Sequence, residues 1–201
     1  MKFTHTFKPE NDIKIISEKN LFKGFFKVNE VTIQHRLFEG GWSDPIRREI
    51  FERGDAVAVL PYDPKEDSVV LIEQIRVPAI NRGKNPWLIE CVAGMVDKDE
   101  SIEQVARREC MEEAGLHVKT LQLMLSYLSS PGGMSERIHV YYGEVDSTEA
   151  MGVHGLDEEG EDIKVHVFKR EEAMNMLASG LIDNAATVIA LQWLELNRHQ
   201  L

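Results

Sequence analysis

The sequence has only two cysteines, Cys91 and Cys110, among its 201 residues, and both lie in apolar surroundings. So few cysteines exclude a disulfide framework and indicate buried thiols, so we expect a reducing compartment, the cytoplasm. No apolar run approaches the roughly 20 residues of a membrane-spanning helix. The segment MKFTHTFKPEND at the start lacks the apolar core of a signal peptide. We therefore expect a cytoplasmic protein with no membrane partner.

Basic residues are also scarce. The chain has 23 Lys and Arg against 34 Asp and Glu, which gives a net charge of −11. This balance argues against nucleic acid or anionic membranes as partners, because their phosphates attract basic proteins. Apolar residues make up 43% and charged residues 28%, as in an ordinary globular protein. The length allows one sizeable domain with a small appendage.

Alternating β-branched, aromatic and polar residues predict many strands and three helices. The predicted strands cover residues 13–17, 25–38, 47–53, 56–62, 68–75, 87–93, 121–128, 138–145 and 163–168. The predicted helices lie within residues 94–116 and over residues 171–179 and 184–197. Antiparallel strand pairs mixed with helices predict an α+β fold, a layered sandwich. Residues 1–53 indicate a small N-terminal β subdomain, followed by a larger domain over residues 54–201.

An acidic run over residues 94–116 carries most of the chemical information. The positions in it that matter most are Gly94, Glu100, Arg108-Glu109, Glu112-Glu113 and Gly115. Asp99 or Ser101 can cap the start of a helix here, and Gly115 can end it. One like-charge pair at about 6 Å costs roughly 3 kcal/mol at an effective dielectric constant near 20. The crowded carboxylates therefore need a positive partner, such as a divalent cation.

The apolar stripe of this helix predicts which way the carboxylates point. The apolar residues within 102–106 fall at helical spacing, and the same stripe continues to Glu109, Glu112 and Glu113. Arg108 can pair with Glu112, four residues further on. Carboxylate ligands suit Mg²⁺, with Mn²⁺ as a substitute, and do not suit zinc. The alternative is a solvated acidic face, but such a face does not normally extend an apolar stripe.

The run resembles the Nudix box, the signature of hydrolases that cleave nucleoside diphosphates linked to another moiety. Every specified glycine, glutamate and arginine matches, and Cys110 in an apolar slot is a small departure. Other segments look like the ADP-ribose pyrophosphatases of that family, namely RREIFERG (47–54), VVLIEQIR (69–76), WLIECVAGM (87–95), LSSPGGMSER (128–137) and HGLDEEGEDI (154–163). The resemblance implies an α/β/α sandwich with a mixed sheet. It also implies a homodimer that exchanges its N-terminal subdomains, with each active site drawing on both chains.

The resemblance implies metal ligands on two elements. In the family, the carbonyl just before the box glycine, here that of Ala93, binds metal together with Glu109 and Glu113. Glu112 can share a second metal. A glutamate of the later acidic loop also binds metal, and the alignment makes it Glu161. Glu100 is expected to pair with the box arginine or to sit at the helix start.

The same loop, residues 157–162, is expected to supply the general base. The alignment places Glu159 as the group that deprotonates water. Glu158 competes for this role, because three glutamates in four residues make errors of one position easy. The alternative for the loop as a whole is a solvated charge run.

Arginines are candidates for substrate contact, because a planar guanidinium bonds two phosphate oxygens at once. The family resemblance points to Arg48, Arg53 and Arg76, and the alternative is pairing with Glu49, Glu52 or Glu73. Phe25 or Phe26 can stack on adenine, although core packing also explains either ring. By resemblance the expected contacts further include Glu49, Met95, Ser130, Gly132 and Glu136.

Together these features predict a metal-dependent pyrophosphohydrolase that cleaves ADP-ribose to AMP and ribose 5-phosphate. The nearer alternative is cleavage of another nucleoside diphosphate sugar, such as GDP-mannose or ADP-glucose, by the same machinery. The farther alternative is a Nudix module that senses a ligand without catalysis. A complete box disfavours that alternative.

Overall fold

The computed structural model describes residues 3–82, 85–96 and 99–201. Residues 83–84 of the segment before the strand predicted over 87–93, and residues 97–98 of the acidic run, lie outside the described residues. The chain forms two compact units. The small unit contains residues 1–54 and 128–136, and the large unit contains residues 55–127 and 137–201. The predicted functional boundary between residues 53 and 54 stays a prediction.

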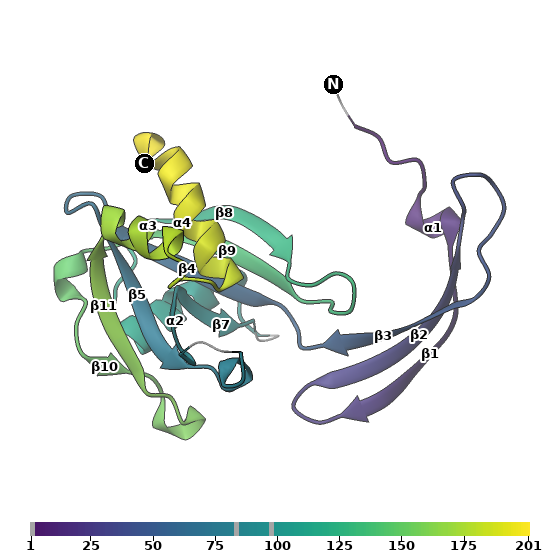
Figure 1. The fold of residues 1–201 in the computed structure, drawn as a ribbon, viewed down its shortest axis with the longest axis horizontal. Helices are drawn as coiled ribbons and strands as arrows, with labels where there is room; N and C mark the ends of the chain where they lie inside the picture. The colour runs from purple at the N-terminus through teal and green to yellow at the C-terminus, as the bar shows by residue number, and fades with distance from the viewer. Residues whose placement is uncertain (1–2, 83–84, 97–98) are drawn as a thin grey trace. The chain divides into compact units, whose positions relative to one another are not determined.

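Most of the predicted elements are present, with shifted ends (Figure 1). The strands are β1 (Ile13–Lys23), β2 (Lys27–His35), β3 (Ile46–Glu52), β4 (Ala56–Asp63), β5 (Ser68–Ile75), β6 (Trp87–Glu90), β7 (Val92–Met95), β8 (Leu121–Leu128), β9 (Arg137–Glu144), β10 (Val153–His154) and β11 (Ile163–Lys169). The α-helices are α1 (Pro9–Asp12), α2 (Ile102–Ala114), α3 (Arg170–Ala178) and α4 (Ala185–Asn197). Short 3-10 helices are η1 (Val77–Ala79), η2 (Ser147–Glu149), η3 (Asp157–Glu159) and η4 (Arg198–Gln200). Within the described ranges, no helix is both long and apolar enough to cross a bilayer.

A mixed sheet forms the middle layer of the large unit. In the described residues its strand order is β10-β11-β5-β4-β9-β8, with β6 beside β5 and β7 beside β4. The pair β4–β9 is parallel, and the other pairs described for β4 and β5 are antiparallel. Helix α2 covers one face, and helices α3 and α4 cover the other (Figure 1). The large unit is therefore an α/β/α sandwich, as predicted.

Strand alternation explains the two apolar cores of this sandwich. On β4, Val57 and Val59 point to the core under α2, whereas Ala58 and Leu60 point to the core under α3 and α4. Strand β5 is buried along most of its length, and the parallel neighbour β9 is buried over residues 140–143. Strands buried on both faces carry nearly continuous apolar runs, which is the pattern that predicted them.

The strand predicted over residues 87–93 is wrong in one respect, because it is two strands that break at Cys91. The backbone N–H of Cys91 donates to the hydroxyl oxygen of Thr187 on α4 at 2.8 Å. The side-chain amide of Asn184, which caps α4, donates to the carbonyl of Ile89 at 2.8 Å. These contacts lead β6 to pair with β5 and β7 to pair with β4.

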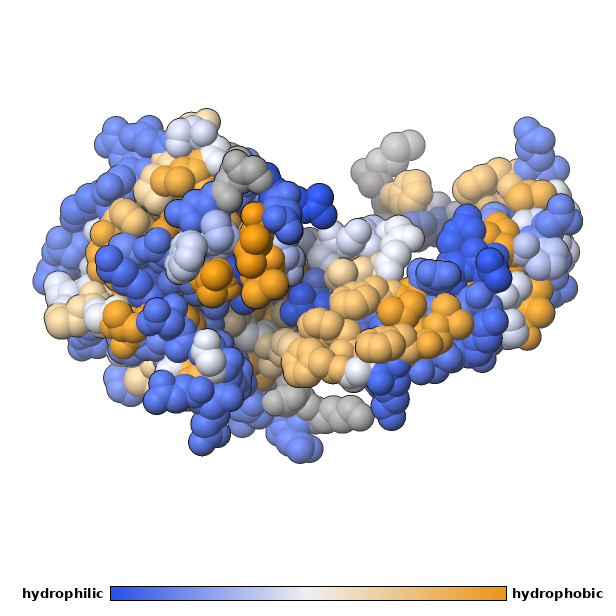
Figure 2. Space-filling view, turned by 60° about the horizontal axis from the view of Figure 1, so that its bottom comes forward, coloured by the Kyte–Doolittle hydropathy of each residue, from blue (hydrophilic) through white to orange (hydrophobic). Residues whose placement is uncertain are grey.

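The small unit contains a three-stranded antiparallel sheet in the order β1-β2-β3. Strand β1 is an edge strand of eleven residues, and every residue in it is exposed. Its large apolar residues are between 45% and 68% exposed, namely Ile13, Ile15, Ile16, Leu21 and Phe22. Figure 2 shows apolar side chains gathered along this unit. Exposed edge strands of this length normally need a cover.

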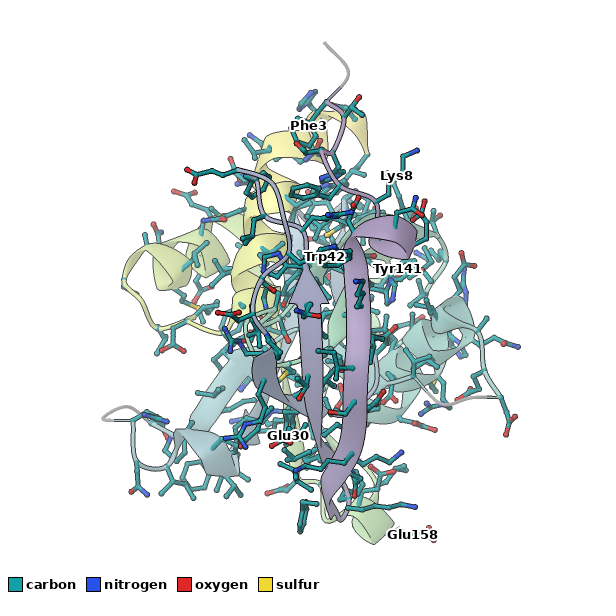
Figure 3. All side chains as sticks on the ribbon, turned by 90° about the vertical axis from the view of Figure 1, so that its right-hand side faces the viewer. Phe3, Lys8, Glu30, Trp42, Tyr141 and Glu158 are labelled. Carbon is teal, nitrogen blue, oxygen red and sulfur yellow. The ribbon has the colours of Figure 1, made fainter. Side chains whose placement is uncertain are left out.

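Cross-strand ion pairs hold the central strand β2. Glu30, labelled in Figure 3, is 9% exposed and lies 2.7 Å from Lys19 on β1 and 3.4 Å from Arg47 on β3. Trp42 contacts two cations, with Lys14 Nζ 3.9 Å and Arg36 Cζ 4.4 Å from the centre of a ring. Pairs of this kind join neighbouring strands of a sheet.

The strand predicted over residues 25–38 is wrong at its start. Strand β2 begins at Lys27, and Phe25 and Phe26 lie in the turn that follows β1, where the Gly24 N–H donates to the Phe26 carbonyl. Alternation along a strand therefore does not decide which way these two rings face. The rings contact each other edge to face, with centroids 4.8 Å apart.

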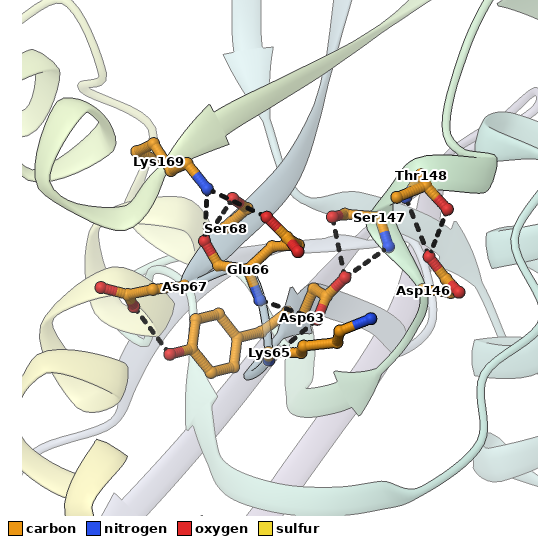
Figure 4. Close-up of polar contacts among 10 residues, drawn as sticks. Asp63, Lys65, Glu66, Asp67, Ser68, Asp146, Ser147, Thr148 and Lys169 are labelled. Atoms are coloured by element: carbon orange, nitrogen blue, oxygen red, sulfur yellow. Dashed lines mark hydrogen bonds and ion pairs between the residues drawn. The ribbon is translucent and has the colours of Figure 1, made fainter.

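A buried aspartate fixes the turn between β4 and β5 (Figure 4). Asp63 is 4% exposed and accepts hydrogen bonds from the backbone and hydroxyl of Ser147, both at 2.9 Å. It also accepts from the backbone N–H groups of Lys65 and Glu66. Burial alone would raise the pKa of Asp63, but these hydrogen bonds outweigh it and lower the pKa.

Candidate active site

Helix α2 is fixed at both ends by its own sequence. Ser101 accepts the N–H of Gln104, and the Gln104 side chain accepts the N–H of Ser101, which completes a capping box. Gly115 ends the helix in the left-handed region, with φ of 66°. The buried residues Val105 and Ala106 face the sheet. The predicted cap at Ser101 and stop at Gly115 are confirmed.

One guanidinium gathers the acidic side chains of α2. Arg108 Nη1 donates to Glu109 Oε1 at 2.9 Å and to Glu112 Oε2 at 2.7 Å. Its Nε lies 3.1 and 3.2 Å from the two oxygens of Glu100. Burial alone would lower the pKa of Arg108, but these carboxylates raise it above its usual value. The expected pairing of Arg108 with Glu112 and with Glu100 is confirmed.

Glu113 is the most buried carboxylate of the helix. It is 2% exposed, and its Oε2 accepts the backbone N–H of Ala93 at 2.9 Å. Burial raises the pKa of Glu113 to about 8, and the charges of Glu109 and Glu161 add to the rise. The protein alone therefore does not neutralise the charge of the Glu113 carboxylate.

Glu109 has a similar environment beside the box glycine. Burial raises the pKa of Glu109 to about 7, and nearby Glu112 and Glu161 raise it further against the opposing charge of Arg108. A Cβ atom added to Gly94 would lie 2.0 Å from Glu109 Oε1. Only glycine at this position of β7 lets the carboxylate approach the strand so closely. The structure therefore brings Ala93, Glu109, Glu113 and Glu161 into one electrostatic neighbourhood.

The acidic loop is tied to α2 at its first glycine. Gly155 donates its N–H to the Glu112 carbonyl at 3.2 Å. Its φ is 104°, and an added Cβ would lie 2.6 Å from the Cβ of Glu161. Glu161 Oε2 accepts the N–H of Leu156 at 3.1 Å. This local closure holds the predicted ligand Glu161 near the box carboxylates.

The two candidate bases lie further out on the same loop. Glu158 and Glu159 belong to η3, and both are exposed. Figure 3 shows Glu158 at the outer end of its loop. Gly160 ends η3 with φ of 70°, a conformation in which side chains are strained. Glu161 lies close enough to the α2 carboxylates to act on Glu109 and Glu113 electrostatically, and Glu159 is exposed on η3.

No metal cage is preformed among the residues that the structure describes. No three His, Cys, Asp or Glu side chains in these ranges lie close enough together to hold an ion. Arg108 occupies oxygens of both Glu109 and Glu112. Release of this arginine would free these oxygens for a cation.

Arg76, the predicted phosphate contact in the large unit, has a partner that sequence reasoning missed. Its Nε lies 2.7 Å from Oε2 of Glu90, whereas the expected partner Glu73 lies 2.7 Å from His166. Pairing of β5 with β6 brings Glu90 close, and only long-range strand register could have revealed it. Met95 ends β7 opposite Ala56 and is half-buried.

The small unit contains a groove of about 290 Å³ between its strands and the turn over residues 131–135. Its lining includes three of the predicted substrate contacts, Arg48, Glu49 and Gly132. The carbonyl of Ser130 accepts the N–H groups of Gly133 and Met134 and so closes this turn. The rest of the wall consists of apolar side chains of β2 and β3, Glu52 of β3 and the other residues of the turn.

Three further predicted contacts form one cluster in the same unit. Arg53 Nε lies 3.0 Å from Glu136 Oε1, and the guanidinium lies 5.4 Å from the ring of Phe26. The Nε–H of Arg53 is buried but not aimed at the oxygen, so the pair is ionic without a hydrogen bond at that atom. Phe25 is 85% exposed. The alternative expected for Arg53, a pair with Glu49 or Glu52, is wrong.

Comparison with known proteins identifies the family to which this chain belongs. A family profile described as "NUDIX domain" matches residues 52–191. ADP-ribose pyrophosphatases from Escherichia coli (strain K12) and Haemophilus influenzae are 55% and 52% identical over 192 and 195 residues. The matches cover 96% of this chain, and 92% and 90% of those proteins.

A more distant relative and a solved structure extend this comparison. A GDP-mannose pyrophosphatase from Cronobacter sakazakii is 34% identical over 188 residues, which cover 92% of this chain and 96% of that protein. A solved structure of an ADP compounds hydrolase has the same fold, with a TM-score of 0.72 and 19% identity over 94% of this chain and 96% of that one. The matched profile and the close relatives show that this chain belongs to the Nudix family.

Proposed function

We propose that this chain is a metal-dependent pyrophosphohydrolase that cleaves ADP-ribose to AMP and ribose 5-phosphate. The observation that carries the proposal is a pair of carboxylates, the buried Glu113 and the half-buried Glu109, on a helix that is held beside Gly94. The substrate follows from 55% identity, along 96% of the chain, to proteins named ADP-ribose pyrophosphatase.

The donor set fits a hard divalent cation, and we propose Mg²⁺, with Mn²⁺ as a substitute. Every candidate ligand is an oxygen: the carboxylates of Glu109, Glu113 and Glu161 and the carbonyl of Ala93, with Glu112 available for a second ion. The raised pKa values of Glu109 and Glu113 indicate that the protein alone does not neutralise these two carboxylates. The chemistry that a bound cation supplies is polarisation of the diphosphate and activation of water.

Proton transfer is assigned to the acidic loop. We propose that Glu159 takes the proton of the attacking water, with Glu158 as the competing residue. Both are exposed and therefore accessible to water. A loop tied to α2 through Gly155 can bring its tip to the substrate while Glu161 stays in place.

Substrate recognition is assigned to both units. We propose that Arg48, Arg53 and Arg76 offset the diphosphate charge and that Phe25 or Phe26 stacks on adenine. The groove with Arg48, Glu49 and Gly132 supports a binding role for the small unit. Ser130, Glu136 and Met95 complete the proposed set.

The small unit is proposed to serve a second copy of the chain. An exposed eleven-residue edge strand with apolar side chains is the surface expected of a subdomain that a partner covers. We therefore propose a homodimer with exchanged N-terminal subdomains, in the cytoplasm, where the free thiols of Cys91 and Cys110 stay reduced. Light scattering of the purified protein at two concentrations measures the mass of the assembly.

The second candidate is a hydrolase of another nucleoside diphosphate sugar. The 34% identity to a GDP-mannose pyrophosphatase supports it at a greater distance. The test is a panel of ADP-ribose, ADP-glucose and GDP-mannose with Mg²⁺ or Mn²⁺, with products separated by chromatography. ADP-ribose should give the highest kcat/KM, and a higher value for GDP-mannose would replace the proposal with this alternative.

A further inference from the structure

Two polar side chains, those of Gln74 and Glu90, lie on the face of β5 and β6 that carries the core under α2. In the register of these strands Gln74 lies opposite Leu88, and Ile72 lies opposite Glu90. Opposed residues share a face of a sheet, and Ile72 belongs to the core under α2. Gln74 and Glu90 are therefore diagonal neighbours on that face, within reach of long side chains.

Arg76 follows β5 and reaches back to Glu90. The distance from its Nε to Glu90 Oε2 is 2.7 Å, and the side chains are 41% and 13% exposed. Arg76 also lies close enough to Glu113 to act on it electrostatically. The half-exposed Arg76 can turn toward an incoming anion. Its departure would leave the largely buried carboxylate of Glu90 without an ion-pair partner.

Gln74 carries the donor that could replace the arginine. The residue is 6% exposed, and among the described residues its buried Nε2 has no hydrogen-bond partner. An unsatisfied buried donor costs stability, so its presence in a well-packed strand calls for a state in which it is used. The carboxylate of Glu90, a diagonal neighbour whose side chain is 13% exposed, is a partner that the chemistry of this donor fits.

We propose that Glu90 is a positioning residue that holds Arg76 in the free enzyme, and that Gln74 donates to Glu90 when Arg76 turns to the substrate diphosphate. The inference rests on the proposed function, because it takes a diphosphate as the incoming anion. Gln74 thereby lowers the cost of moving Arg76. Neither Gln74 nor Glu90 touches the reacting atoms.

The test is a double-mutant cycle with Gln74→Met and Glu90→Gln in the full chain. Gln74→Met keeps the length of the side chain and removes the donor. Leaving the largely buried acceptor of Glu90 unpaired is costly, so Gln74→Met should raise the KM for ADP-ribose about tenfold. The melting temperature should stay the same or rise, since the removed donor has no partner in the free enzyme. In the Glu90→Gln background, where no buried charge remains, Gln74→Met should leave KM unchanged.

Glu73→Gln is the matched control, because Glu73 neighbours Gln74 in β5 but pairs with His166. It should leave KM unchanged. Binding of an ADP-ribose analogue with a methylene bridge, measured by calorimetry, should repeat the KM pattern without turnover. A Gln74→Met variant that lowers the melting temperature and keeps the KM of the parent, or that raises KM equally in both backgrounds, overturns the inference.

Substrate assays of the wild-type protein distinguish a failure of this inference from a failure of the proposed function. If it prefers GDP-mannose, the proposed substrate fails, and the same cycle run with GDP-mannose still decides the role of Gln74. If it hydrolyses no nucleoside diphosphate sugar, both proposals are refuted.

Discussion

Burial of Glu113 makes the stability of the metal-free protein depend on pH. The pKa of this carboxyl is about 8 in the folded chain, against an ordinary glutamate value of 4.5. Between these values the folded state keeps a proton that the unfolded state has lost. The free energy of unfolding therefore falls as pH rises from about 4.5 to 8. One such group contributes a slope of about 1.4 kcal/mol per pH unit in the middle of this window.

Glu113→Gln removes this titration while keeping the shape of the side chain. In EDTA, urea unfolding at pH 5.5 and 7.5 should show the wild type losing about 2 kcal/mol more than the variant. Mg²⁺ should restore stability to the wild type at pH 7.5, because the cation neutralises the buried carboxylate as the proton does at low pH. Glu103→Gln, in the first turn of the same helix, is the control and should keep the wild-type slope. A Glu113→Gln variant with the wild-type slope would refute this account of the carboxylate.

Other residues give independent predictions. Gly94→Ala forces a Cβ against Glu109, so the Mg²⁺ concentration for half-maximal activity should rise at least about tenfold, with circular dichroism unchanged. Ser101→Ala removes the capping hydroxyl of α2 and should cost about 1 kcal/mol in urea unfolding, with kcat nearly preserved. Glu159→Gln should lower kcat while an ADP-ribose analogue still binds in calorimetry; if Glu158→Gln is the slower variant instead, the base is Glu158. Asp63 has a lowered pKa, so the stability that it contributes is present above the unfolded pKa and is lost as pH falls through the folded pKa. Urea unfolding between pH 5 and 3 should therefore show a smaller fall in the free energy of unfolding for Asp63→Asn than for the wild type.

The sequence was most informative where local patterns decide the structure. The ends of α2 follow from Ser101 and Gly115, and the pairing of Arg108 with Glu112 follows from a spacing of four residues. The continuous apolar runs of β4 and β5 identified the central strands, since strands buried on both faces need them. These features depend on neighbours within a few residues.

Features that depend on distant pairing were missed. The second half of β1, residues 18–23, has no apolar alternation because both of its faces are exposed, and its strand conformation comes from pairing with β2. The break at Cys91 depends on Thr187, far along the chain. The pairing of Arg76 with Glu90 depends on the register of β6. The segment 128–136 packs with the small unit although it follows β8 directly.

Within the candidate site, chemistry was easier to predict than position. The spacing of the glutamates predicted a cluster of acidic side chains, and the structure shows why Gly94 must be glycine. It also shows that Arg108, predicted to pair only with Glu112 and Glu100, holds Glu109 as well. Sequence reasoning missed that this arginine occupies oxygens that a cation needs.

Release of AMP from ADP-ribose tests the central claim most directly. The purified chain is assayed with Mg²⁺, after removal of metal with EDTA, and after Mg²⁺ is restored, with Glu113→Gln in parallel. The account predicts AMP and ribose 5-phosphate in equal amounts with Mg²⁺, no product in EDTA, full recovery on restoring the metal, and a large loss of rate in the variant. Turnover that persists in metal-free buffer, or a Glu113→Gln variant as active as the wild type, would contradict it.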